Sequence, residues 1–173
     1  MTHATYTDAL VLATRALHQT KHILEVAQKH VTDSSVSEST ILELTLAPDM
    51  FSFTRQIQSV SDNAKGLASR ISGVEAPSMM DTEASLAELI TRIDSTLAFV
   101  TSVSPMDSDA VDAQEVSFHW LPNKAIKGHD CILLMNIPNL YFHFSMAYAN
   151  LRSHGIPVGK MDFLGALPFY DKI

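Results

Sequence analysis

The chain has 173 residues, of which 46% are hydrophobic, and its formal net charge is −7 at pH 7. This length and apolar content predict one globular domain over residues 1–173 with a core of its own, and they exclude a disordered chain. The basic residues are few and scattered, so we expect no nucleic acid partner, because such binding requires a clustered basic surface.

Two features predict a cytoplasmic protein. Asp8, Arg15 and His18 interrupt the N-terminal segment, so it has no signal-peptide pattern. Apolar runs such as residues 131–135 are far shorter than the roughly 20 residues that cross a bilayer, so we expect no membrane partner. The single cysteine, Cys131, lies in that run, which predicts a buried and unreactive thiol.

The first half of the chain predicts two long amphipathic helices. Apolar residues recur at three- and four-residue spacing over residues 6–31, and the polar stretch 32–39 ends this helix. A second apolar series occupies residues 50–72. Asp49 is expected to cap its start, and Gly73 is expected to end it.

The second half predicts two more helices separated by a connector. The third helix is expected over residues 83–103 with Thr82 as its cap, and the fourth over residues 129–154 with a kink at Pro138. Alternating residues within the segment 105–128 indicate a short hairpin or an extended connector. We therefore predict an all-α fold, a four-helix bundle with this connector between helices three and four.

Several sequence blocks resemble one known family. They comprise residues 46–51, 56, 62, 64–66, 70, 81–83, 138–143, 147–152 and 159–165. Together these blocks are similar to an uncharacterised bacterial family of unknown function within the DinB/YfiT-like superfamily of metalloenzyme-like proteins. The resemblance implies a four-helix bundle that is often a homodimer. Relatives in the superfamily place three histidines around a divalent metal, and some of them are thiol-dependent transferases.

The three-histidine pattern that the resemblance implies is incomplete here. It requires one histidine on the second helix and two histidines, four residues apart, on the fourth. His143 matches the last position, whereas Asn139 and Gln56 stand at the other two. Because zinc and nickel prefer nitrogen and sulfur ligands, we expect no metal and no cofactor at this place.

Gln56, Asn139 and His143 are the candidate ligand-binding residues. One interpretation is a pocket near Pro138 that binds a small polar ligand. The other is a satisfied hydrogen-bond network that sets the register of the helices. The sequence assigns no catalytic residue, so whether the chain is an enzyme stays open.

Two further patterns carry weaker signals. His18 and His22 lie four residues apart on the first helix, a spacing that could hold a metal, but we expect a solvated or interface-edge face because no carboxylate motif accompanies them. Residues 163–170 are unusually apolar, which predicts a tail that docks on the bundle or on a second subunit.

Three functional hypotheses follow. The leading one is a small-ligand-binding or interaction module, acting as a homodimer and lacking the intact three-histidine metal site. The alternative is a divalent-metal-dependent enzyme such as a thiol transferase, in which His119 or His129 joins His143. The third is a partner-binding bundle without a pocket, against which a cavity lined by the three candidate residues would argue.

Overall fold

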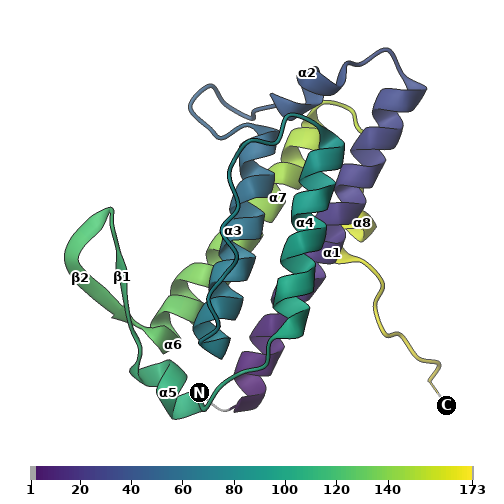
Figure 1. The fold of residues 1–173 in the computed structure, drawn as a ribbon. Coiled ribbons are helices and arrows are strands. Elements are labelled where there is room, and N and C mark those ends of the chain that lie inside the picture. The colour runs from purple at the N-terminus through teal and green to yellow at the C-terminus, as the bar shows by residue number, and fades with distance from the viewer. Residues whose placement is uncertain (1–2, 173) are drawn as a thin grey trace.

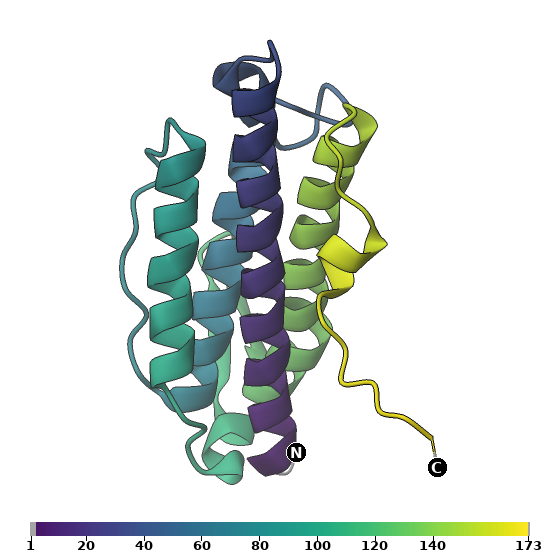
Figure 2. The same cartoon turned by 90° about the vertical axis from the view of Figure 1, so that its right-hand side faces the viewer.

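The computed structural model describes residues 3–172, and the side chains from residue 5 onward. Four long helices lie side by side as a bundle (Figures 1 and 2). They are α1 (His3–Asp33), α3 (Phe53–Ser72), α4 (Leu86–Ser102) and α7 (Ile137–Ser153). Helix α1 packs against α4, α3 and α7, and α3 packs against both α4 and α7. The predicted all-α bundle is therefore confirmed.

Short elements connect and flank the long helices. They are α2 (Glu38–Leu42), α5 (Ser108–Ala113), α6 (Gly128–Asp130), the π-helix η1 (Cys131–Asn136) and α8 (Lys160–Leu164), with strands β1 (Glu115–Phe118) and β2 (Leu121–Lys127). The two strands pair antiparallel, so the predicted hairpin between the third and fourth long helices is confirmed. It projects away from the bundle beside η1 and α7 (Figure 1).

Serines cap two of the long helices, and the predicted caps Asp49 and Thr82 were wrong. The Ser52 hydroxyl accepts a hydrogen bond from the Arg55 amide at the start of α3, and Ser85 caps α4 in the same way. A serine oxygen meets a free amide of the first turn as well as aspartate does, so composition alone does not choose between nearby candidates. The predicted end of α3 at Gly73 is confirmed, with a φ of 73°.

A π-helix precedes Pro138, where the sequence predicted a kink. Over Cys131–Asn136 the turns are wider than in an α-helix, and the Ile137 amide donates to the carbonyl of Ile132, five residues earlier. Proline has no amide hydrogen to donate and crowds the carbonyl four residues before it. A wider turn just upstream is one way in which a helix accommodates this disruption.

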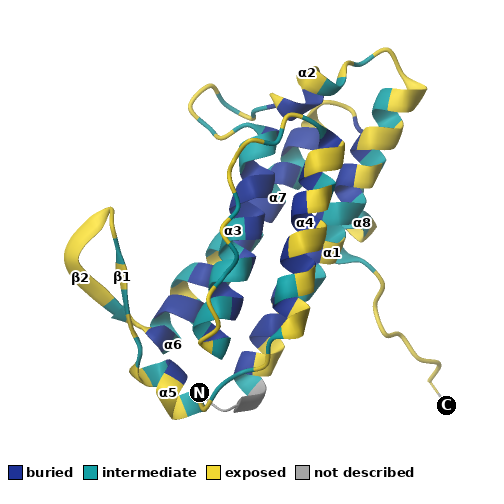
Figure 3. Cartoon of the chain, viewed as in Figure 1, coloured by how far each residue is buried: buried dark blue, intermediate teal, exposed yellow. Residues whose placement is uncertain are grey.

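The core lies between the four long helices (Figure 3). Cys131 is fully buried as predicted, and burial raises the pKa of its thiol. Within residues 3–172, no helix combines the length and the apolar character needed to cross a membrane.

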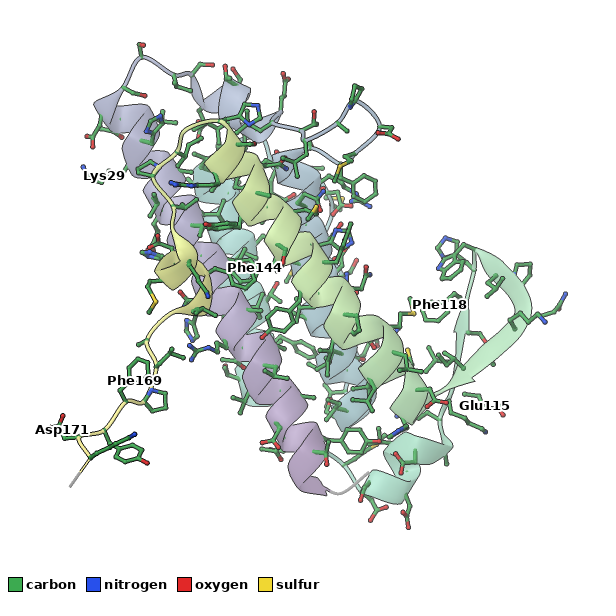
Figure 4. All side chains as sticks on the ribbon, turned by 180° about the vertical axis from the view of Figure 1, so that it is seen from behind. Lys29, Glu115, Phe118, Phe144, Phe169 and Asp171 are labelled. Carbon is green, nitrogen blue, oxygen red and sulfur yellow. The ribbon has the colours of Figure 1, made fainter. Side chains whose placement is uncertain are left out.

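The C-terminal segment docks in part. Phe163 of α8 stacks on Phe144 with 4.2 Å between the ring centroids, and the Arg15 guanidinium donates to the carbonyl of Ala166. Beyond that point the chain leaves the bundle (Figures 1 and 4), and Phe169 and Tyr170 are 85% and 86% exposed. Docking on the bundle is thus confirmed for α8 but not for the last apolar residues.

Candidate functional site

Gln56 and His143 meet in the interface between α3 and α7. Gln56 lies in the first turn of α3, and its backbone amide donates to the carbonyl of the cap residue Ser52. His143 lies near the middle of α7. Both side chains are buried, and 2.8 Å separates His143 Nδ1 from Gln56 Oε1. Two of the three candidate residues are therefore in direct contact.

The hydrogen bonds of Gln56 decide which imidazole nitrogen carries the proton. Gln56 Nε2 donates to the carbonyl of Phe51, so Gln56 Oε1 is the atom turned toward the histidine. An amide oxygen only accepts, so His143 Nδ1 must be the donor. In a neutral imidazole the other nitrogen, Nε2, is then a hydrogen-bond acceptor. Among the described side chains, none donates a hydrogen bond to His143 Nε2.

The surroundings of His143 favour its neutral form. Burial lowers the pKa of the imidazole below its usual range, and the positive charge of Arg55 lowers the pKa further. Both causes act on the charged form, because an imidazolium loses hydration in the interior and is repelled by a nearby cation. At neutral pH, His143 is accordingly an uncharged acceptor with a defined tautomer.

Two half-exposed phenylalanine rings flank this acceptor. The Phe51 ring is nearly parallel to the imidazole, with 6.1 Å between centroids and 10° between planes. The Phe142 ring meets the imidazole edge-on at 5.2 Å. Phe51 and Phe142 are 49% and 51% exposed, so part of each ring surface beside His143 faces solvent. The Arg55 guanidinium lies 5.6 Å from the centre of the Phe51 ring.

Asn139, the third candidate residue, contacts a different partner. It is half-buried one turn before His143, and its Nδ2 donates to Asn63 Oδ1 of α3 over 3.0 Å. The structure therefore joins Gln56 to His143 and Asn139 to Asn63, and it does not join all three. Asn63 was missed because an asparagine at a helix surface gives no local sign of a partner 76 residues away.

The three-histidine metal site implied by the resemblance does not fit these residues. At the matching positions the chain presents one imidazole and two amides, and the imidazole and one amide are already bonded to each other. In the described part of the chain, no group of three or more His, Cys, Asp or Glu side chains is placed to hold a metal ion. The donor set and its geometry both disfavour tight zinc or nickel binding.

The His18 and His22 pair is divided between two environments. His18 is exposed, whereas His22 Nε2 lies 2.7 Å from Asp162 Oδ1 of α8. Asp162 also accepts from the Gly159 amide, and this bond, followed by the contact with His22, lowers the pKa of the Asp162 carboxyl group. His22 therefore helps to hold α8 on α1, a contact between residues 140 positions apart.

A buried arginine that the sequence did not reveal organises a second polar cluster. Arg92 of α4 has a side chain only 2% exposed, and it forms ion pairs with Asp62, Asp81 and Glu83 at 2.9–3.0 Å. These pairs connect α3, α4 and the segment before α4. Gln58 donates to the far oxygen of Glu83. Each of the three acidic groups is paired with the Arg92 guanidinium. We therefore interpret the cluster as structural, because its charges already bind one another.

The comparisons with known proteins agree with this fold. A family model described as a domain of unknown function, DUF1993, matches residues 5–164. The crystal structure of a DinB family member protein from Shewanella denitrificans is similar, with a TM-score of 0.90 and 33% sequence identity over 98% of this chain and 96% of that chain. No curated protein matches. The resemblance to an uncharacterised DinB-like family is thereby confirmed.

Proposed function

Because this chain belongs to the DUF1993 family and has a DinB-like fold, we propose that it binds a small polar ligand at the Gln56–His143 pair without a resident metal. The observation that carries this proposal is the 2.8 Å hydrogen bond from His143 Nδ1 to Gln56 Oε1. It leaves Nε2 as an oriented acceptor between two half-exposed rings. The ligand supplies an O–H or N–H donor to this atom.

The composition of the site supports a ligand that is partly aromatic or apolar. Small-molecule sites are typically apolar surfaces with a few well-placed polar groups that orient the ligand. Here Phe51 and Phe142 provide the apolar surface, and His143 provides the polar group. Because His143 is uncharged at neutral pH, it selects for a hydrogen-bond donor and adds no charge of its own to the site.

The alternative, a divalent-metal-dependent enzyme such as a thiol transferase, requires further ligands beside His143. His129 cannot supply one, since it precedes His143 by fourteen residues in one continuous helical segment, which corresponds to about 20 Å. His119 is exposed at the turn of the hairpin. The geometry therefore favours the ligand-binding proposal.

A donor-dependent preference for phenol over its methyl ether, anisole, tests the proposal. Phenol can donate to His143 Nε2 and anisole cannot, and one net hydrogen bond corresponds to a preference of about 2- to 12-fold. In the wild type, nuclear magnetic resonance of the imidazole nitrogens identifies Nε2 as the atom affected. Backbone amide resonances measure both affinities in the wild type and in the variants. His143→Phe retains a ring but no acceptor, and it is expected to abolish the wild-type preference.

The matched control is His18→Phe, which removes an exposed histidine outside the site and should leave the phenol preference unchanged. Anisole is more hydrophobic than phenol in every variant. Comparing the ratio of the two affinities between variants therefore cancels this difference. An identical ratio in wild type and in folded His143→Phe would contradict the proposal.

Elemental analysis addresses the alternative directly. Protein purified without an affinity tag is expected to contain zinc and nickel at well below one ion per chain, because one imidazole and two amides are weak ligands for these metals. Stoichiometric metal that is lost in His143→Ala would replace the ligand-binding proposal with the metalloenzyme.

We also propose that the chain acts as a cytoplasmic homodimer. Support for the dimer comes from Phe169 and Tyr170, whose side chains are exposed in the single chain and would be covered by a second copy.

A further inference from the structure

A groove lies between the hairpin and the start of α7. The hairpin itself stands away from the bundle (Figure 1). The volume of the groove is about 380 Å³, within the range of small-molecule sites. The lining residues are Trp120, Leu134, Met135, Pro138, Asn139 and Phe142. Neither Gln56 nor His143 lines it, although Phe142 borders both places.

Contacts with the bundle support the hairpin wall of the groove. Trp120 is 59% exposed, and its ring stacks on Phe118 with 5.3 Å between centroids. Phe118 is the last residue of β1 and lies on the side of the hairpin that faces the bundle (Figure 4). The Arg70 guanidinium of α3 is 5.9 Å from the centre of the Phe118 ring. The contacts between Arg70, Phe118 and Trp120 link the hairpin to the bundle, so the indole is positioned before any ligand arrives.

The opposite wall comes from η1 and the first turns of α7. Leu134 is 70% exposed although it lies in a helical segment of the bundle, and Phe142 is half-exposed. None of the lining side chains carries a charge. The walls therefore suit an uncharged, flat and largely apolar molecule.

The polar group of the groove is the amide of Asn139, and a chain of hydrogen bonds sets its orientation. Asn63 Nδ2 donates to the carbonyl of Ser59, so Asn63 Oδ1 must be an acceptor. Asn139 Nδ2 donates to that oxygen. This leaves Asn139 Oδ1 as the acceptor that the amide can offer to the groove.

We propose that this groove binds an uncharged, planar heteroaromatic compound with one N–H or O–H donor. The ring lies against Trp120 and Phe142, and the donor bonds to Asn139 Oδ1. This inference goes beyond the ligand site at His143, because it uses another acceptor and, apart from Phe142, other wall residues. Because the two acceptors differ, the donor preference of each site can be tested separately.

Benzimidazole and 1-methylbenzimidazole form a matched pair of probes, since methylation removes the donor and keeps the ring system. Trp120 is the only tryptophan of the chain, so its fluorescence reports binding at the groove. We expect both probes to change the emission. Benzimidazole is expected to bind about 2- to 12-fold more tightly, the preference that one net hydrogen bond provides.

Two variants distinguish the contribution of the aromatic wall to binding from that of the Asn139 acceptor. Trp120→Leu is expected to weaken both probes equally, as followed through the side-chain amide resonances of Asn139. Asn63→Ala releases the Asn139 amide, so it should bring the ratio of the two affinities toward one and leave 1-methylbenzimidazole binding unchanged. Phe169→Leu, on the exposed tail, is the matched control and should change neither affinity.

Other outcomes would overturn the inference. Equal binding of the two probes to the wild type would mean that the Asn139 oxygen is not used. Trp120 emission that depends on protein concentration without any probe would show that a second copy of the chain covers the groove. His143→Phe should leave the preference for benzimidazole over 1-methylbenzimidazole intact. A negative result in the phenol experiment would therefore not contradict the proposal for this groove.

Discussion

Replacing Arg92 with methionine is expected to lower the free energy of unfolding by about 3 kcal/mol. Removal of one partner from a buried ion pair costs about 3–5 kcal/mol, because the other charge stays behind without compensation. We expect a loss at the lower end of this energy range, because two of the three acidic partners are partly exposed. Asp62 and Asp81 are 41% and 37% exposed and can be hydrated in the variant, whereas Glu83 is only 12% exposed. Urea unfolding followed by circular dichroism measures the change.

The matched control is Lys21→Met, which breaks an ion pair with Asp94 of similar length, 2.7 Å, but with side chains 31% and 48% exposed. Exposed pairs contribute about 0–1 kcal/mol, so this variant should be close to wild type. Equal losses in Arg92→Met and Lys21→Met would show that the Arg92 cluster contributes no more to stability than an exposed ion pair.

The pH dependence of the Arg92 effect follows from Glu83. Burial opposes its ionisation, but hydrogen bonds from Arg92 and Gln58 outweigh burial, so the pKa of Glu83 lies below its ordinary value of 4.5. A carboxyl group with a lowered pKa stabilises the folded state above its ordinary pKa, and this contribution is lost as the pH falls through the lowered value. The difference between wild type and Arg92→Met should therefore shrink below about pH 4.5.

Phe144→Ala is expected to destabilise the protein by about 3–5 kcal/mol, the usual range for truncation of a buried phenylalanine. Phe144 lies inside the bundle on α7 (Figure 4) and is 1% exposed. Its ring is parallel to that of Phe163, with centroids 4.2 Å apart, so truncation leaves a cavity and also removes the surface on which α8 docks. Chemical unfolding gives the free energy, and proteolysis of the C-terminal segment reports detachment of α8.

Phe142→Ala provides the comparison for Phe144→Ala, since it alters the same residue type on the same helix. Phe142 is half-exposed, so its truncation should cost much less than that of Phe144. If the two variants lost the same stability, the assignment of Phe144 to the core and of Phe142 to the surface would be wrong.

The helices and the hairpin could be predicted because their signals are local. Apolar spacing marked α1, α3, α4 and α7, and alternation marked the hairpin. The starts of α3 and α4 could not be placed to the residue. Asp49 and Ser52 are equally plausible caps in isolation, and the choice depends on tertiary contacts such as the bond from the Phe53 amide to the carbonyl of Leu44.

The candidate site was predictable only in part. Gln56 and His143 were chosen through the resemblance, and the structure joins them. Asn139 was chosen through the same resemblance, at the position four residues before His143, yet its amide bonds to Asn63. One turn of helix sets which face a residue occupies, but the partner of a polar side chain depends on the neighbouring helix and its register.

By itself, the sequence determined the four amphipathic helices, the connector between the third and fourth, and the burial of Cys131, because each depends on periodicity or composition within a short window. Only the tertiary structure decided the polar pairings, namely His143 with Gln56, Asn139 with Asn63 and Arg92 with Glu83. Those pairings join side chains brought together by packing, and the energy of a buried polar group depends on the partner that packing supplies.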